Sequence, residues 1–223
     1  MRFANINGAR AEPAPTAKGS CPNCDGEVIA KCGKHVIWHW SHKSLTHCDQ
    51  WWENEGEWHR AWKNRFPADW QEVILQSTTG ERHVADIRTP AGVVIELQRS
   101  SIDPAEVHAR EAYYQNMIWV IDGCRNEFDP INFGMARSDV RTGNGYVGFR
   151  WAGRSKLFAR WHSTKPVFID FGKAGFWRIC RYDLATKRGA AQLMSPDRFT
   201  QLLISAETDF SQGGGPATVD AAP

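Results

Sequence analysis

The chain has 223 residues, 42% of them hydrophobic, and a formal net charge of +2 at pH 7. This composition excludes global disorder and is sufficient for one packed domain, or one domain with a small addition. The first residues lack the apolar core of a signal peptide, and no run of about 18 apolar residues occurs, so we expect a cytoplasmic protein with no membrane contact.

The sequence is expected to divide into five segments. The first is a flexible leader, the second is a small element rich in Cys and His, and the third is a compact α/β core. The fourth is an extension that packs on this core, and the fifth is a disordered tail of low complexity. In chain order they cover residues 1–20, 21–50, 51–125, 126–205 and 206–223.

The Cys- and His-rich element has the spacing of a zinc site. Cys21 and Cys24 form one close pair, and His39 and His42 form a second pair after a predicted hairpin that turns at Gly33. Two pairs on either side of a ribbon suit tetrahedral Zn²⁺, and four protein ligands leave no open position, which indicates a structural site. The alternative is that the cysteines are small apolar residues in a loop. Rival ligands are Cys32, His35, His47 and Cys48.

A helix is predicted over residues 51–66. Trp58, Trp62 and Phe66 recur every four residues and would form its buried face. Pro67 cannot continue the helix and marks its end.

A second stripe of the same helix carries Glu55, His59 and Lys63, again four residues apart. These side chains can point together into a cleft beside the sheet, where His59 could contact a phosphate or donate a proton. The alternative is a charge ladder on the helix surface.

Three strands are predicted next, and a tight hairpin joins the last two. In the hairpin loop, Pro90 fixes φ at the first turn position and Gly92 tolerates a positive φ. The resulting register places Asp86 directly opposite Glu96. The strands cover residues 70–75, 82–88 and 93–98.

The hairpin brings two carboxylates together. Strand alternation places Asp86, Glu96 and Gln98 on one face. Directly opposed side chains have Cβ atoms about 5 Å apart, so the two acids should share a proton or hold a cation. Carboxylate oxygens suit Mg²⁺ or Mn²⁺. The alternative is a solvated sheet face on which Arg88 pairs with either acid.

A second helix and a fourth strand complete the predicted core. Asp103 suits the N-cap, Pro104 the first helical position and Glu106 the capping box. The apolar run at 117–122 predicts a short buried strand. Further strands are predicted over residues 146–153, 166–172 and 176–183, followed by a helix over 195–206 that Ser195 caps.

A basic stretch follows the core, at residues 149–165. It contains Arg150, Arg154, Lys156 and Arg160 and no acid, and aromatic residues are interleaved with them. Basic groups neutralise phosphates and aromatic rings stack on bases, so the stretch is a candidate nucleic-acid surface. The alternative is a set of basic side chains that lie over a tryptophan-rich core.

Six motifs occur in an order that resembles the competence protein CoiA-like family, a branch of the PD-(D/E)XK nuclease superfamily. The resemblance covers about residues 21–122 and implies an α/β (α+β) core of the restriction-endonuclease type behind a zinc-ribbon-like element. The motifs are "CPNC", "HWSH", "EGEWHRAWK", "ADI", "IELQRSSI" and "REAYY".

The resemblance also implies roles for individual residues. Asp86 and Glu96 would hold the catalytic Mg²⁺, and Glu55, or alternatively Glu57, would complete its coordination. Gln98 stands where the superfamily more often has lysine; it could orient the attacking water but brings no charge. Lys63 is a possible substitute donor. Two residues of the second helix, Arg110 and Tyr114, would contact phosphate, or would instead be a core tyrosine and a capping arginine.

These observations together predict a Mg²⁺-dependent nuclease that hydrolyses phosphodiester bonds of DNA during DNA processing or recombination. The alternative is a DNA-binding or recombination-assisting protein of the same fold that does not cleave. RNA is a third possible ligand.

Overall fold

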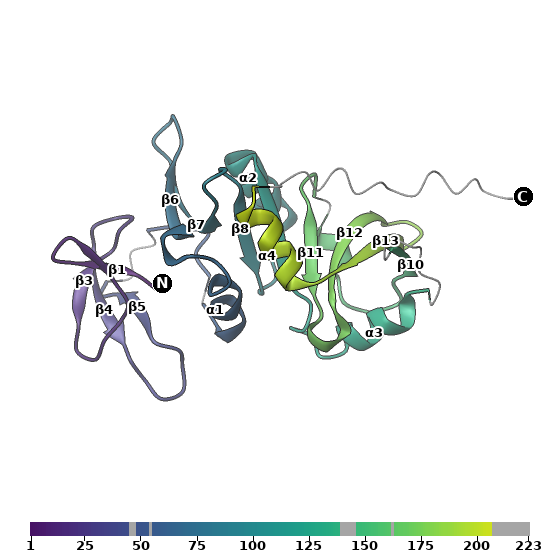
Figure 1. Ribbon diagram of the computed structural model, residues 1–223, viewed down its shortest axis with the longest axis horizontal. Coiled ribbons are helices and arrows are strands. Elements are labelled where there is room, and N and C mark those ends of the chain that lie inside the picture. The colour runs from purple at the N-terminus through teal and green to yellow at the C-terminus, as the bar shows by residue number, and fades with distance from the viewer. Residues whose placement is uncertain (45–47, 54, 139–145, 162, 207–223) are drawn as a thin grey trace, which may run out of the picture. The chain divides into compact units, whose positions relative to one another are not determined.

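The structure is a computed structural model that describes residues 1–44, 48–53, 55–138, 146–161 and 163–206. It has a mixed α+β architecture (Figure 1). The chain divides into two units, Met1–Leu97 and Gln98–Pro223.

The first unit begins with a five-stranded antiparallel sheet of order β2-β1-β3-β4-β5. Its small core contains Ala4, Cys21, Val28 and Trp40. Residues 1–20, expected to be a flexible leader, therefore form three strands. Each is only three residues long and lacks an apolar repeat, which is why the sequence pattern did not reveal them. The strands are β1 (Ala4–Ile6), β2 (Ala9–Ala11), β3 (Lys18–Ser20), β4 (Glu27–Lys31) and β5 (His39–His42).

The first unit continues with a helix that is shorter than predicted. Helix α1 spans Glu57–Lys63, and its N-cap Gly56 has an extended backbone and no side chain to cap the first turn. Trp62 and Phe66 are buried, as the apolar repeat predicted, whereas Trp58 is only half-buried. A 3-10 turn, η1 (Ala68–Trp70), then leads into the next strand.

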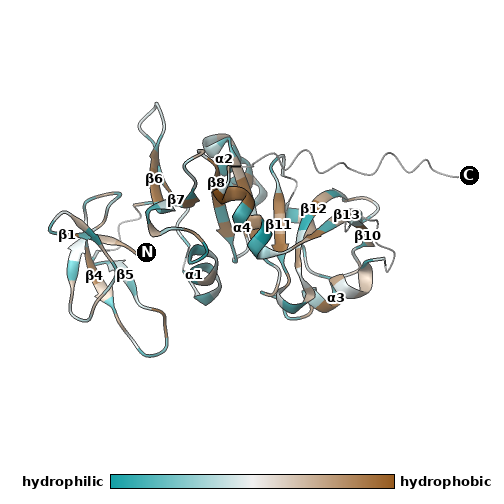
Figure 2. Ribbon diagram, in the orientation of Figure 1, coloured by the Kyte–Doolittle hydropathy of each residue, from teal (hydrophilic) through white to brown (hydrophobic). Residues whose placement is uncertain are grey.

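Three antiparallel strands, β6-β7-β8, follow in this unit. The predicted hairpin register is confirmed, because Ile87 pairs with Ile95 and Arg88 with Val94. Gly92 has φ 81°, and its N–H donates to the carbonyl of Thr89. Figure 2 shows brown, hydrophobic stretches on β6 and β8. The strands are β6 (Gln71–Gln76), β7 (Arg82–Arg88) and β8 (Val94–Gln98).

The second unit contains strands in the order β10-β13-β12-β11-β9. Strand β11 is parallel to β9, and the other neighbouring pairs are antiparallel. The strands are β9 (Met117–Asp122), β10 (Tyr146–Arg150), β11 (Val167–Asp170), β12 (Phe176–Asp183) and β13 (Arg188–Met194). Strand β13 escaped prediction because its sequence, RGAAQLM, has mainly small residues and no β-branched residue.

Both predicted helix caps of the second unit are confirmed. Asp103 caps α2 by accepting a hydrogen bond from Ala105 N, and Ser195 caps α4 by accepting one from Arg198 N. Helix α3 was not predicted. The helices are α2 (Pro104–Tyr114), α3 (Asp129–Ala136) and α4 (Pro196–Ile204), with 3-10 turns η2 (Phe158–Arg160) and η3 (Gly172–Ala174).

Aromatic side chains form much of the core of the second unit. Phe133 contacts Phe149, Phe158, Phe171 and Trp177, with ring centroids 4.6 to 6.0 Å apart. Among the described residues, no helix is long and apolar enough to cross a membrane. The predicted tail lies outside the described residues from residue 207 onwards.

Candidate functional site

The loop that follows β3 presents two cysteines in a tight turn. The N–H of Asp25 donates to the carbonyl of Cys21, and the N–H of Cys21 donates to the carbonyl of Gly26. Asp25 has φ 59°, and a Cβ at Gly26 would lie 3.2 Å from Sγ of Cys24. The turn therefore holds both thiols on the same side, with glycine leaving room for the second one.

Four side chains of the first unit converge beside this turn. Cys21, Cys24, His42 and Cys48, the Cys3His cluster, have ligand atoms that all lie within 4.8 Å of one another. The Sγ atoms of Cys21 and Cys48 are 3.8 Å apart, and Sγ of Cys24 is 3.3 Å from Nε2 of His42. A zinc tetrahedron with Zn–S bonds of about 2.3 Å has S–S edges of about 3.8 Å. The donor set and its spacing therefore fit Zn²⁺.

The cluster differs from the predicted ligand set at one position. His39 and His42 lie three residues apart on β5, so they point to opposite faces of the strand. His39 Nδ1 instead lies 2.9 Å from the carbonyl oxygen of Ile37, and Cys48 supplies the fourth ligand. Of the other rivals, Cys32 and His35 are not in the cluster, and His47 lies outside the described residues.

A hydrogen bond links two thiols of the cluster, those of Cys21 and Cys48. A hydrogen bond from Cys48 lowers the pKa of the Cys21 thiol to about 5, although burial acts in the opposite direction. The same interaction raises the pKa of Cys48. Because zinc binds thiolates, one ligand of the cluster is already poised to ionise at neutral pH.

A second group of polar residues lies across β6, β7 and β8. The residue pairs that flank Glu72 and Asp86 in the β6–β7 ladder place these two acids opposite each other. Continuing the β7–β8 register places Asp86 opposite Glu96. Three carboxylates therefore occupy one row across three strands. With Glu55 and Lys63 they form what we call the acid–lysine cluster.

Lys63 is the cation of this cluster. Its Nζ atom lies 2.9 Å from Asp86 Oδ1, 3.3 Å from Glu72 Oε1 and 3.3 Å from Glu55 Oε1, and its side chain is only 4% exposed. Burial by itself lowers the pKa of a lysine, but the three carboxylates outweigh burial and raise the pKa of Lys63. Lys63 is therefore charged at neutral pH.

The two acids predicted to face each other do so through backbone hydrogen bonds. Asp86 Oδ2 accepts from the N–H of Leu97 at 3.0 Å, and Glu96 Oε1 accepts from the N–H of Asp86 at 3.3 Å. Burial opposes ionisation of Asp86, yet the Lys63 ammonium lowers the pKa of this carboxyl below its usual value. Glu96 is 3% exposed. Both carboxylates thus point toward the neighbouring strand, and the Asp86 side chain remains 22% exposed.

The structure also distinguishes between the two candidate glutamates, Glu55, which precedes α1, and Glu57, which is its first residue. The side chain of Glu55 is only 5% exposed, contacts Lys63 and accepts a hydrogen bond from Arg60 at 2.8 Å, whereas Glu57 is exposed. Burial opposes ionisation of Glu55, but Lys63 and Arg60 together lower its pKa. Glu55 is therefore the glutamate that belongs to the acid–lysine cluster.

His59 lies on the buried side of α1. Its Nε2 donates to the carbonyl of Leu97 at 2.6 Å, so this nitrogen carries a proton. Its Nδ1 is buried and has no hydrogen-bond partner among the described residues. His59 thereby fixes the backbone of β8 beside Glu96.

Three further predicted site residues are Gln98, at the end of β8, and Arg110 and Tyr114 on α2. Gln98 is buried, and its amide donates to the carbonyl and the hydroxyl of Ser100 at 3.3 and 3.2 Å. Arg110 is buried and donates to Glu106, one turn earlier, at 3.0 Å. Tyr114 is buried in the core. The positions of Arg110 and Tyr114 agree with the alternative of a core tyrosine beside a packed arginine.

The predicted basic stretch separates into exposed cations and buried rings. Arg150, Arg154 and Lys156 are exposed, and Arg160 donates to the Ser101 hydroxyl at 2.9 Å. The interleaved rings of Phe149, Trp151 and Phe158 are buried and pack on one another. These rings are part of the hydrophobic core, which agrees with the alternative interpretation of this stretch.

One residue of the acid–lysine cluster was missed from the sequence. Glu72 has φ 47°, a left-handed conformation that is rare for glutamate, and its carboxylate accepts from the backbone N–H groups of Arg2 and Phe3. Burial opposes its ionisation, but Lys63 lowers its pKa. The available signal was a single acid within the apolar strand WQEVIL.

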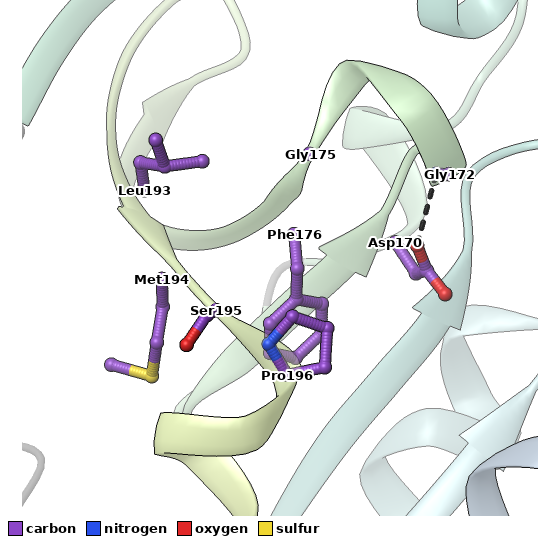
Figure 3. Close-up of a pocket in the computed structure, with 8 residues that line it drawn as sticks. All are labelled: Asp170, Gly172, Gly175, Phe176, Leu193, Met194, Ser195 and Pro196. Atoms are coloured by element: carbon purple, nitrogen blue, oxygen red, sulfur yellow. Dashed lines mark hydrogen bonds between the residues drawn. The ribbon is translucent and has the colours of Figure 1, made fainter.

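The second unit also contains an open pocket of about 370 Å³. Phe176, Leu193, Met194 and Pro196 form its apolar lining, and Asp170 accepts from the N–H of Gly172 at its edge (Figure 3). None of the catalytic, metal-binding or nucleic-acid-binding residues predicted from the sequence lines this pocket.

Comparison with known proteins gave one match. Residues 16–50 match the family model described as competence protein CoiA, N-terminal domain. No curated protein and no solved structure matched the chain. The matched segment contains all four residues of the Cys3His cluster. This segment is therefore similar to the N-terminal domain of CoiA, which supports a relationship of the chain to the CoiA-like family.

Proposed function

We propose that this protein is a metal-dependent nuclease that hydrolyses DNA phosphodiester bonds in a competence-related process. The observation that carries the proposal is the pairing of Asp86 with Glu96 across β7 and β8, with the Lys63 ammonium 2.9 Å from Asp86. The match of residues 16–50 to the CoiA N-terminal domain supports the competence-related context.

The chemistry of the paired acids suits a divalent cation. Asp86 and Glu96 offer hard oxygen donors, and Mg²⁺ is commonly held by one or two carboxylates together with waters and substrate phosphates. When bound, Mg²⁺ or Mn²⁺ would lower the pKa of a water and neutralise charge on the phosphate. The buried position of Glu96 favours such compensation, because an ionised carboxylate away from solvent is costly.

The remaining residues of the acid–lysine cluster have positioning roles. Lys63 keeps Asp86 ionised and fixes Oδ1, while the N–H of Leu97 fixes Oδ2. Glu55 and Glu72 hold the Lys63 ammonium in place from two other directions. Lys63 thus supplies positive charge beside the acids in a chain where Gln98 stands at the usual position of lysine.

The Cys3His cluster has a structural role in this proposal. Four protein ligands would fill the coordination sphere of Zn²⁺ and leave no position for a substrate or water. Zinc would join the loop after β3, strand β5 and the segment at Cys48. The sheet that these segments flank is small, and its core contains only four buried residues. Metal binding would then contribute to the folding of this sheet.

A cleavage assay tests the proposal directly. The purified protein is incubated with single-stranded, double-stranded and branched DNA, with added Mg²⁺, with added Mn²⁺ and without added divalent metal. We expect cutting that needs the metal and that falls by about 100-fold or more in Asp86→Asn, since loss of one essential group typically costs that much. Asp69→Asn, which changes an exposed acid of the same unit, is the matched control. Cutting by Asp86→Asn at the parent rate would refute the assignment.

A DNA-binding protein that does not cleave is the second candidate. The observation that favours it is the burial of Lys63 among three carboxylates. These contacts already neutralise the positive charge that a nuclease would use to stabilise the phosphate. DNA binding with no cutting in either metal would support this candidate over the nuclease.

A further inference from the structure

Strands β10, β13 and β12 of the second unit present two different faces. On one face, Phe149 and Tyr182 stack across Gly189 with their ring centroids 6.0 Å apart, and a side chain at Gly189 would collide with the Phe149 ring. This face belongs to the aromatic core. Arg150 and Arg188 alternate with these residues and therefore point to the opposite face.

A β-bulge in β12 brings two more arginines to that opposite face. Arg178 pairs with Gln192 and Arg181 pairs with Ala190, because the register shifts between Ile179 and Arg181. Residues three apart in a regular strand would point to opposite faces, but the extra residue re-aims the second one. We call the resulting set of Arg150, Arg178, Arg181 and Arg188 the arginine face (strands β10, β12 and β13 in Figure 1).

The positive charge of the arginine face has little compensation from the protein. Arg150 lies directly opposite Arg188, and like charges at opposed positions destabilise strand pairing. In the part of the chain that the structure describes, none of the four guanidinium groups forms an ion pair.

Asp183 is the single acid within these three strands. Asp183 of β12 lies opposite Arg188 of β13. Its Oδ1, however, accepts from both the backbone N–H and the hydroxyl of Thr186 at 2.7 Å. These hydrogen bonds lower the pKa of Asp183 and commit this oxygen to the turn. Within these three strands, one acid therefore lies on the same face as four arginines.

We propose that the arginine face is a docking surface for the phosphate backbone of double-stranded DNA. Guanidinium groups bind phosphate oxygens in a bidentate manner, and an anion between Arg150 and Arg188 would relieve their repulsion. The aromatic residues on the same face, Tyr146, Phe168 and Phe176, are buried, so no described ring is exposed there for stacking on unpaired bases. This chemistry favours a duplex over a single strand. The choice of DNA rests on the proposed function, but the docking itself needs no cleavage.

Binding of a labelled DNA duplex tests the proposal. The triple variant R178Q/R181Q/R188Q is compared with the parent, both in an Asp86→Asn background so that cleavage does not interfere. In the arginine variant, the magnitude of the slope of log association constant against log salt concentration should decrease by about 3. Its affinity for the duplex should weaken by about 10-fold or more at moderate salt. The matched control is K18Q/K31Q/K34Q, which removes the same charge from exposed lysines of the first unit. It should bind within about twofold of the parent, as expected when no phosphate contact is lost.

Three results would overturn the proposal. They are an unchanged salt slope in the arginine variant, an equal loss of affinity in both triple variants, and tighter binding of a single strand or of phosphatidylserine vesicles than of the duplex. If the triple variant melts below the parent, Arg181→Gln alone, at an exposed position, should lower the salt slope by about 1. Absence of cutting by the parent would reject the nuclease but leave these binding results intact.

Discussion

Lys63 Nζ lies 2.9 Å from Asp86 Oδ1, and the same nitrogen contacts Glu72 and Glu55 in a site where the lysine side chain is 4% exposed. One buried cation therefore holds acids from three separate segments of the first unit. Removing one partner of a buried ion pair leaves the other charge buried without compensation. The resulting loss of stability is larger than the net stabilisation that the intact pair provides.

Lys63→Met should consequently lower the free energy of unfolding by about 3–5 kcal/mol, because three carboxylates lose their common cation. Urea denaturation of the full-length protein, monitored by tryptophan fluorescence, measures this change in the free energy of unfolding. Lys34→Met, at an exposed position, is the matched control and should change stability by less than about 0.5 kcal/mol. A loss below about 1 kcal/mol in Lys63→Met would contradict the buried ion cluster.

The same cluster predicts a pH dependence of stability. Burial opposes ionisation of Glu55, Glu72 and Asp86, but Lys63 together with the other charges and hydrogen bonds around each acid lowers all three pKa values on folding. Their contribution is therefore present above the unfolded values of about 4 and is lost as pH falls through the lower folded values. The raised pKa of Lys63 gives a contribution that is present below about pH 10.4 and is lost above it.

Denaturation of the parent should accordingly show a fall in stability below about pH 4 and another above about pH 10. Lys63→Met should show a smaller dependence at both ends. Equal slopes of unfolding free energy against pH in the two proteins would mean that these acids titrate without reference to Lys63.

Zinc content distinguishes the observed ligand set from the one expected from sequence. Cys48→Ser should abolish stoichiometric Zn²⁺, since it removes one of four ligands, whereas His39→Ala should retain it. Elemental analysis of the purified proteins measures the metal. Co²⁺ substitution of the parent should add strong thiolate-to-metal absorption that weakens in Cys48→Ser. Retention of zinc by Cys48→Ser together with its loss from His39→Ala would restore the original assignment.

Asp49 ties the segment next to the Cys3His cluster to β7. Its carboxylate oxygens lie 2.9 Å from His83 Nδ1 and 2.8 Å from the N–H of Val84, and Trp51 stacks on the His83 ring. Asp49→Ala leaves buried polar groups unsatisfied and should cost about 1–3 kcal/mol. Thermal unfolding is the measurement, with Asp69→Ala as the control. An unchanged melting temperature would show that this contact does not stabilise the unit.

Short-range rules were enough to predict several features from the sequence. Pro90 and Gly92 determine the hairpin loop, and the loop length then sets Asp86 opposite Glu96. Asp103 and Ser195 begin their helices because their side chains accept from backbone N–H groups within the same turn. Each of these depends on residues fewer than about a dozen positions apart, so local geometry decides them.

Other features depended on segments that are distant in the chain. Glu72 joins the site through the register of β6 on β7 and through Lys63, and Cys48 replaces His39 because β5 turns alternate residues to opposite faces. The bulge between Ile179 and Arg181 reverses the face that alternation predicts for Arg181. Strand pairing and the folding of loops over one another fix these positions, and neither leaves a local periodic signal. The sequence by itself therefore determined the hairpin and the helix caps, whereas the tertiary structure decided which distant side chains meet.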